Sequence, residues 1–547
     1  MTRTSASFHR LLAALTLTSS GAALGIGGCA DLAADCREGN CLGAGGGGLA
    51  SSTSSSAPGH GGAGGHGGAA TSGEGGAGGS APTSCDPKLA NDAVANSCGV
   101  FVSTTKGSNS ADAEGTKEKP FASLDKAIAH AASTGAKALY VCGEKFTESA
   151  QLPSGIDVYG GLDCAKNWRP KAGLKSALHG VTDQIALRVV GAGQSRLRDV
   201  AIVAANATNP GGSSIALLVS EATLDLEDVD LTAGDAAAGA TGASEPMAAK
   251  SGTKGSQGKT GCISNASVQP DVAPKTACDD LSLSIAGNGG VGNEFDGAAG
   301  TSGNSQPLVA YSNGGAGQTA AGIACKDGTA GLPGVPGMPG DGAVGLGTLD
   351  VTKGFVGVVG GAGKSNGTPG QGGGGGGGGS GKKSCTDTMF AAPSGGSGGS
   401  GGCGGKSASG GDSGGSSIAL VSLNAKITFK SGSLTAKSGG AGGQGGAGQE
   451  GGAGFGGGGG GIGNSSDACK GGQGGAGGRG GAGGGGRGGH SIGLAYLGTK
   501  PDTDEAAVPI KAGAAGKGGP GGNGGEMNIG GAGAPGVSAA MQSFDMP

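Results

Sequence analysis

Glycine repeating with a period of three is the feature that most constrains this chain. The 547 residues include 136 glycines, and in the runs that begin at Ala441, Lys470 and Ala514 a non-glycine residue recurs at every third position. Three residues per turn is the repeat of the polyproline-II helix, which has no internal hydrogen bonds. The period predicts neighbouring helices joined backbone to backbone, with the third residue facing outward. The alternative is a flexible linker, because glycine loses the most entropy on ordering.

Composition limits the kinds of core and partner. Only 3% of the residues are aromatic, which together with the glycine content excludes two ordinary hydrophobic cores. The net charge of −4 and the lack of interleaved aromatic and basic residues give no sign of a basic surface that would bind nucleic acid. We expect no nucleic-acid partner, and the oligomeric state is left open.

A repeated unit organises the rest of the chain. Residues 211–233 align without a gap on residues 414–436, with 11 of 23 positions identical. A third copy starts at Gly488, and an earlier one includes residues 185–202, in which residues 197–202 match residues 226–231. Each glycine-rich run returns to such a unit at a Gly-Gly-x-Ser-Ile sequence. We therefore expect the runs to leave and re-enter the repeats near one corner.

Within the unit, apolar residues alternate with polar ones and shift phase once. Leu224 and Leu226 share one face, and Val229 and Leu231 continue it after the shift. Period two with one shift is typical of short strands joined by a bend. Stacked copies can share an apolar column that a single copy cannot bury. The repeat predicts a mainly β fold, a parallel β-solenoid.

The segment upstream of the repeats resembles a known superfamily. Residues 115–121 (GTKEKPF) precede a helical pattern at 122–132 with Ser123 as candidate N-cap, and ALYVCGEKFTE follows at 138–148. This order resembles the start of right-handed parallel β-helix proteins of the pectate-lyase-like superfamily, over residues 112–233. The resemblance implies a right-handed parallel β-helix with an N-terminal capping helix, interrupted by glycine-rich polyproline-II-like or disordered insertions.

Two further stretches resemble cell-surface proteins. Residues 159–169 look like part of a β-helix lipoprotein of myxobacterial type. The GGAGG blocks at 61–65 and 439–443 resemble the polymorphic glycine-rich (PGRS) sequences of mycobacterial surface proteins. These resemblances imply exposure at a cell surface.

The start of the chain predicts export and lipidation. Two arginines precede the apolar residues 11–26, a segment too short to span a bilayer comfortably, and the sequence continues to Cys29 through two glycines. That ending resembles the lipobox of bacterial lipoproteins and implies a diacylglycerol thioether on Cys29. Ala30 stands where inner-membrane lipoproteins of Gram-negative bacteria carry Asp, which implies the outer membrane. An ordinary secretory signal is the alternative.

These features divide the chain into eight segments. They are the signal peptide (1–28), a Gly/Ser-rich linker (29–84), the β-helix cap and first coils (85–234), a glycine-rich insertion (235–413), a β-helix coil (414–438), a second insertion (439–489), a further coil (490–512) and a glycine-rich C-terminal segment (513–547).

The cysteines predict disulfides and no metal site. Of thirteen cysteines, twelve remain after lipidation of Cys29, an even number for an exported chain. None has CxxC spacing or a histidine at zinc-ligand distance. Proximity along the chain predicts the pairs Cys36–Cys41, Cys85–Cys98, Cys142–Cys164, Cys262–Cys278 and Cys385–Cys403, with Cys325 and Cys469 left to pair over distance.

Motifs for cofactors fail on spacing. The Gly-Lys-[Ser/Thr] sequences at 258–260, 363–365 and 405–407 lack the first glycine that a phosphate-binding loop needs. Glu294 occupies the Asp position of a lone calcium-repeat fragment, and His60 and His66 form a pair without a third ligand. We assign no cofactor and no metal.

One dense acidic strand edge carries the only catalytic hypothesis. It consists of Asp225, Glu227, Asp228 and Asp230, and a β-helix polysaccharide lyase or hydrolase would need such clustered acids. The repeat alignment places Asp225 over Thr428 and Glu227 over Lys430, which favours a cross-strand ion pair instead. We assign no catalytic residue.

The sequence thus favours a non-enzymatic cell-surface lipoprotein with a structural, adhesive or matrix-contact role. It would contact the membrane through its lipid and a cell-surface polysaccharide or matrix through its exposed face. A polysaccharide-acting enzyme is the first alternative. Ice or flat-surface binding by a polyglycine bundle is the second.

Overall fold

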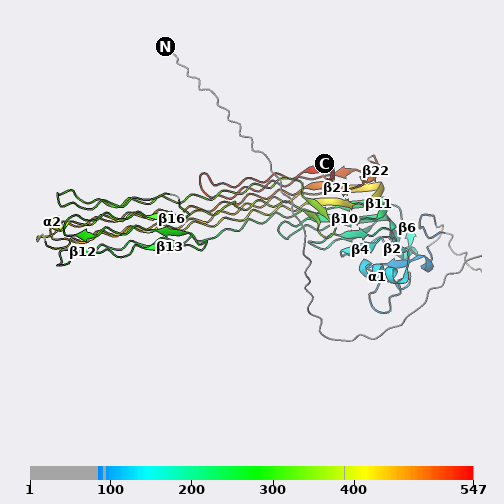
Figure 1. Ribbon diagram of the computed structural model, residues 1–547. Helices are drawn as coiled ribbons and strands as arrows, with labels where there is room; N and C mark the ends of the chain where they lie inside the picture. Colours follow the sequence, from blue (N-terminus) through cyan, green and yellow to red (C-terminus); the bar gives the residue numbers. More distant parts are fainter. Residues whose placement is uncertain (1–83, 90–93, 309, 387–388, 505, 546–547) are drawn as a thin grey trace, which may run out of the picture. The chain divides into compact units, whose positions relative to one another are not determined.

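The computed structural model describes residues 84–89, 94–308, 310–386, 389–504 and 506–545, all within one compact unit, Gly78–Pro547. Most strands of the described residues belong to two large sheets, in which nearly all strands run parallel (Figure 1). Sheet A contains β1 (Val100–Val102), β2 (Ala138–Cys142), β3 (Lys145–Thr147), β5 (Asp157–Asp163), β6 (Arg169–Pro170), β7 (Ser176–His179), β9 (Gln194–Val203), β11 (Thr223–Thr232), β20 (Lys426–Thr435), β22 (Asp502–Thr503) and β23 (Ile510–Lys511). Sheet B contains β4 (Ala150–Pro153), β8 (Leu187–Val190), β10 (Ser214–Ser220), β19 (Ser417–Leu423), β21 (Ser491–Leu497) and β24 (Ser538–Ser543).

The remaining elements are short. The helices are α1 (Leu124–Thr134), α2 (Gly381–Ser384) and the 3-10 turns η1 (Asn96–Cys98) and η2 (Cys164–Lys166). Small antiparallel sheets pair β12 (Ser267–Val268) with β15 (Gly292–Asn293), β14 (Leu283–Ile285) with both β13 (Lys275–Ala277) and β16 (Asn304–Gln306), and β17 (Thr348–Asp350) with β18 (Gly354–Val356).

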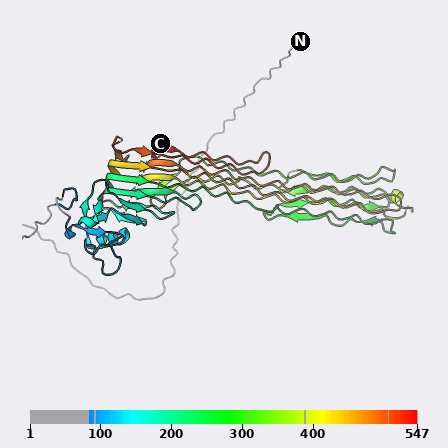
Figure 2. The same cartoon turned by 180° about the vertical axis from the view of Figure 1, so that it is seen from behind.

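Consecutive repeat strands alternate between the two sheets, so the chain advances in coils. From β8 to β11 the strands lie in sheets B, A, B and A, and Figure 2 shows the same stacking from behind. The predicted repeat alignment is confirmed by the strand register, since Ser417 lies between Ser214 and Ser491, and Asp225 pairs with Thr428. The predicted mainly β fold with parallel sheets is therefore confirmed.

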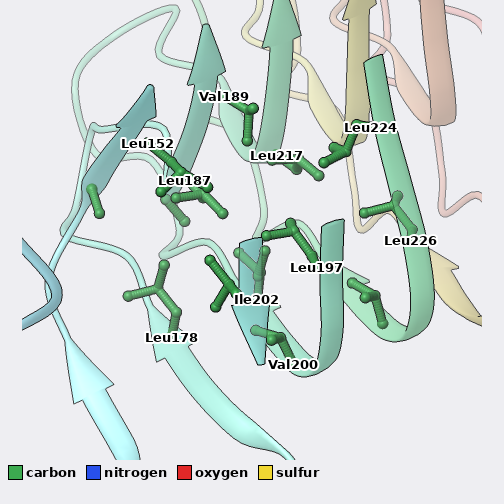
Figure 3. Packing of buried hydrophobic residues seen from close by; sticks show 14 of the residues in the cluster. Leu152, Leu178, Leu187, Val189, Leu197, Val200, Ile202, Leu217, Leu224 and Leu226 are labelled. Atoms are coloured by element: carbon green, nitrogen blue, oxygen red, sulfur yellow. The ribbon is translucent and has the colours of Figure 1, made fainter. Parts of the chain in front are cut away.

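Aliphatic side chains fill the space between the sheets (Figure 3). Strands of both sheets contribute to one column, which burial from water stabilises by about 25 cal/mol per Å² of apolar surface. Its members include Leu187, Val189 and Leu217 from sheet B, and Leu197, Leu224 and Leu226 from sheet A, all buried.

Helix α1 packs one face onto the same core. Ala127 and Ala131 are fully buried, with Leu124 and Ile128 nearly so, as the helical pattern predicted. The predicted N-cap is confirmed, because the Ser123 hydroxyl accepts a hydrogen bond from the Lys126 N–H. The helix contacts strands β1, β2 and β4.

The single phase shift in each repeat is a bend at a left-handed residue. Asp199 has φ 54° and Asp228 has φ 55°, at matching positions of β9 and β11, and Gly432 with φ 128° follows in β20. Asp is one of the few residue types besides glycine that adopts this conformation readily. The bend therefore stacks in successive coils and brings the two aspartates together.

A column of serines joins the coils to the glycine-rich runs. Ser214, Ser417 and Ser491 lie in register at the starts of β10, β19 and β21. The Ser417 hydroxyl donates to the Gly234 carbonyl at 2.7 Å and accepts from the Lys437 N–H at 2.9 Å, and Ser491 then donates to the Lys437 carbonyl at 2.6 Å. These are the serines of the Gly-Gly-x-Ser-Ile sequences. The runs thus leave and re-enter at one corner, as predicted.

The glycine-rich runs form a hydrogen-bonded bundle of extended segments, which we call the glycine bundle: residues 235–261, 286–304, 312–345, 357–380, 392–416, 436–490 and 513–537. The N–H groups of three consecutive glycines, 372–374, donate to three different segments, at the carbonyls of Asn304, Gly399 and Thr329. The same pattern recurs three residues later, which is the repeat of a polyproline-II helix. In the described residues the runs are thus ordered as a bundle, which decides between the bundle and the flexible linker that the sequence left open.

Every third residue of a bundle segment is glycine where a neighbouring segment leaves no room for a side chain. In the segment 470–490, Gln473 and Ala476 occupy third positions that are exposed. Gly485 occupies the same kind of position where residues 516–522 cover the segment, and a Cβ there would lie 1.9 Å from the Gly519 carbonyl oxygen. A side chain is thus tolerated where no segment packs, as at Gln473, or where a small one fits between segments, as at Ala482, which is fully buried.

Three of the five disulfides join distant segments of the glycine-rich part of the chain, and two of these correct the predicted pairing. The described residues contain Cys85–Cys98, Cys142–Cys164 and Cys325–Cys469, as predicted, and also Cys262–Cys385 and Cys278–Cys403. The predicted pairs Cys262–Cys278 and Cys385–Cys403 are wrong. The chain folds back between extended segments, so cysteines 123 and 125 residues apart meet, whereas near neighbours along the chain lie on separate segments. Cys29, Cys36 and Cys41 lie outside the described residues.

Because the bundle segments approach closely, replacing glycine by alanine should destabilise the bundle at some positions and not at others. A Cβ at Gly375 would lie 1.8 Å from the Asn288 carbonyl oxygen, whereas a Cβ at Gly459 would meet nothing within 4 Å. Gly375→Ala is expected to destabilise the bundle by about 1–3 kcal/mol or more, through overpacking. Amide hydrogen exchange should show lost protection across residues 371–379, with Gly459→Ala indistinguishable from the wild type. Equal protection in both variants would contradict the bundle.

The serine column predicts that alanine substitutions at two serines of strand β19 have different effects on stability. Ser417→Ala leaves the Gly234 carbonyl and the Lys437 N–H without their partner, at a cost of about 1–3 kcal/mol in the free energy of unfolding. Ser422 on the same strand is the control, because its hydroxyl is buried and has no hydrogen-bond partner among the described residues. Ser422→Ala should be neutral or slightly stabilising. Urea unfolding of both variants measures the difference, and the column has no structural role if Ser417→Ala is also neutral.

Candidate functional site

Charged side chains form a network on sheet A where β9 and β11 lie side by side. Arg198 is 8% exposed and lies between two carboxylates, with Nη1 2.5 Å from Asp86 Oδ1 and Nη2 2.9 Å from Glu227 Oε2. Lys88 Nζ lies 3.2 Å from Glu227 Oε1, and the guanidinium of Arg198 stands over the ring of Tyr159. The segment Ser84–Leu89 is thereby fastened to the sheet.

The other acids of β11 are paired as well. Lys175 Nζ lies 2.9 Å from Asp228 Oδ1 and 2.6 Å from Asp230 Oδ2. The Ser433 hydroxyl donates to Asp230 Oδ1 at 2.6 Å. Three of the four acids of the predicted catalytic edge thus form ion pairs.

The sequence predicted correctly that Glu227 forms a cross-strand ion pair, but the predicted partner, Lys430, is wrong. The register slips beside Glu227, so this residue lies opposite Ser431 rather than Lys430. Its cation comes from the other neighbouring strand, where Arg198 lies opposite Glu227. The match of residues 197–202 to residues 226–231 contained this signal, since it superposes Arg198 on Glu227.

Asp225 lies apart from this network. It lines a shallow hollow of about 260 Å³ together with Lys137, Asp157 and Arg196. Asp157 accepts a hydrogen bond from the Arg196 backbone N–H at 2.8 Å. The hollow therefore has carboxylates and basic side chains together, but Asp225 is separate from the paired acids with which the sequence grouped it.

The two stacked bend residues have opposite pKa shifts. Burial, together with the neighbouring Asp228 carboxylate, raises the pKa of Asp199 to about 6. Lys175 lowers the pKa of Asp228. Burial opposes the shift at Asp86, but the hydrogen bond from Arg198 prevails and lowers its pKa. Asp199 is thus the acid of this network that holds its proton at mildly acidic pH.

A second candidate site is a polar groove beside sheet B, with a volume of about 590 Å³. Five stretches of the chain line it, and their side chains include Asp125, Gln151, Gln184, Arg188, Asn209, Lys353 and Phe355. The hairpin of β17 and β18 forms one wall. The sequence indicated none of this, because the hairpin lies 163 residues beyond Arg188, to which it is bonded.

The motifs that failed on spacing also lack the geometry of binding sites. The N–H groups of Gly258, Gly363 and Gly405 donate to carbonyls of neighbouring bundle segments, so they are not available to a phosphate. No group of three or more metal-ligating side chains occurs among the described residues. His60 and His66 lie outside those residues.

Comparisons with known proteins identify no family. No family model, no curated protein and no solved structure matches the chain. In the described part of the chain, no helix is both long and apolar enough to cross a membrane.

The raised pKa of Asp199 predicts a pH dependence of stability. The unfolded chain releases this proton near pH 3.8, whereas the folded chain keeps it to about pH 6. The folded state therefore binds more protons in that window, and this group makes the free energy of unfolding fall as the pH rises from about 4 to about 6.

Asp199→Asn cannot release a proton and keeps a residue type that tolerates the left-handed bend. Its free energy of unfolding relative to the wild type should rise across the same window and then level off. Urea unfolding at intervals between pH 4 and pH 7 measures this. A difference that stays constant with pH would show that Asp199 has an ordinary pKa.

Proposed function

We propose that this chain is a lipid-anchored protein of a bacterial cell surface with a structural, adhesive or matrix-contact role and no enzymatic activity. Its repeats are right-handed parallel β-helix coils with α1 as an N-terminal cap. The lipid on Cys29 tethers it, in the outer membrane of a Gram-negative bacterium. The disulfides of the described residues are compatible with export.

The observation that carries this proposal is the construction of the glycine bundle. Its interior consists largely of backbone, so the side chains of its outer segments face outward at every third residue. In the segment 439–453, Ala441, Gln444, Ala447 and Glu450 are all exposed in this way. A long rigid array of regularly spaced side chains suits contact with an extended surface.

The ion pairing of the acidic edge favours this function over catalysis. A general acid or base needs a protonation state that changes during turnover. Glu227, Asp228 and Asp230 instead neutralise Arg198, Lys88 and Lys175. Asp199 beside Asp228 is the observation that keeps a polysaccharide lyase or hydrolase as the second candidate, because its raised pKa suits proton transfer.

Lipidation is tested by Cys29→Ala. The full chain expressed in a Gram-negative host is expected to incorporate labelled palmitate and to sediment with membranes, and Cys29→Ala should abolish both. Cys36→Ala is the matched control and should keep both, because it removes a nearby cysteine outside the lipobox. Label retained by Cys29→Ala would contradict the anchor.

The absence of catalysis is tested with polygalacturonate as substrate. The full chain should release no new reducing or unsaturated ends. Release that is lost in Asp199→Asn or Asp228→Asn would replace the proposed function by the second candidate.

A further inference from the structure

We propose that the polar groove beside sheet B binds a neutral oligosaccharide. This inference rests on the proposed cell-surface role and names the chemistry of the partner. The groove has about 590 Å³, within the range of about 300–1,000 Å³ that is usual for ligand sites.

The groove forms where the outer face of sheet B changes from apolar to polar along one column of side chains. Gln151, Arg188 and Leu218 are neighbours in that column, on β4, β8 and β10. Leu218 belongs to an apolar cluster with Phe355 of the hairpin, which covers this part of the sheet. At Arg188 the cover ends and the column turns polar. A polar floor therefore lies beside an apolar wall.

The hairpin wall is held in place. Arg188 donates from Nη1 to the Val351 carbonyl and from Nη2 to the Thr352 carbonyl, each at 2.5 Å. Gly354 has φ 78°, and a Cβ there would lie 2.3 Å from Ile215 Cδ1, so the backbone of the hairpin rests directly on the sheet.

The opposite wall is fixed by a carboxylate. Asp183 Oδ1 accepts from the Thr208 N–H at 2.7 Å and from the Asn209 N–H at 3.1 Å, and Oδ2 accepts from the Thr208 hydroxyl at 2.6 Å. These hydrogen bonds hold two loops together. A groove with both walls fixed before binding loses little entropy when a ligand enters.

Three amide side chains in the groove are available to a ligand. The side chains of Gln151, Gln184 and Asn209 line it and have no hydrogen-bond partner among the described residues. An amide offers donors and an acceptor together, and a sugar hydroxyl does the same. A set of three such amides suits a row of hydroxyl groups.

The lining of the groove has no net positive charge that would attract an anion. Asp125 and Asp183 are balanced by Arg188 and Lys353, so the lining has no net formal charge. Phe355 lines the same groove at the edge of its apolar cluster, with only 7% of its surface exposed. The observations therefore favour a neutral oligosaccharide over an acidic one.

Isothermal titration calorimetry on the full chain tests the groove with cellohexaose, mannohexaose and β-1,4-galactohexaose. At least one of these should bind. The double variant Gln151→Ala/Gln184→Ala should lower that affinity at least tenfold. The matched control, Gln444→Ala/Gln473→Ala, removes two exposed glutamine side chains from the glycine bundle and should bind like the wild type.

The proposal is overturned if none of the three hexasaccharides binds, if the groove variant binds like the wild type, or if both double variants lose binding equally. Tighter binding of oligogalacturonate than of every neutral probe also overturns it. Other results would contradict the proposed function without contradicting the groove. Cleavage of a bound hexasaccharide would end the non-enzymatic role and keep the groove, whereas loss of palmitate labelling would remove the anchor and leave the titration unaffected.

Discussion

Backbone hydrogen bonds between extended segments are the constraint on which this structure depends. An N–H of one segment reaches a carbonyl of the next only when no Cβ stands between them. At Gly375, which has neighbours on every side, an added Cβ would lie 1.8 Å from a carbonyl oxygen. The requirement holds where an added Cβ would meet a neighbouring backbone. It is absent at the rim, where Gln473 is exposed, and at interior positions such as Ser397 and Ser400, whose buried hydroxyls accept hydrogen bonds from a neighbouring segment. The glycine content is therefore a consequence of packing, and the exceptions are exposed residues or small buried ones such as Ser397 and Ala482.

The coils give these segments their starting points. Ser214 and Ser417 are 203 residues apart and lie opposite each other on adjacent strands. The insertion between them, residues 235–413, returns to the neighbouring coil because the serine column and the shared aliphatic core hold the two ends of each run together. The disulfide Cys325–Cys469 cross-links two bundle segments that are 144 residues apart in the sequence. A small number of well-packed coils thus supports a bundle with almost no hydrophobic interior of its own.

The same topology produces both candidate sites. Stacking of coils brings Arg198 beside Glu227, and it brings the bend residue Asp199 beside Asp228. The insertion sends a hairpin back onto sheet B, where Arg188 binds it and the groove forms along its edge. The first site is a satisfied network that fastens the start of the described chain to the sheet. The second has amides without protein partners, which is why it is the place to look for a ligand.

The sequence by itself determined the features that follow from short, repeated patterns of residues. The period of three indicated the bundle, the period of two indicated the strands, and the repeat alignment placed Asp225 over Thr428 and already superposed Arg198 on Glu227. The tertiary structure alone decided the partner of Cys262, the register slip at Glu227 and the groove at Arg188. Those depend on which distant segments become neighbours. A local period specifies how a segment presents its faces, but a disulfide, a slipped register or a pocket wall is decided by what packs against that face.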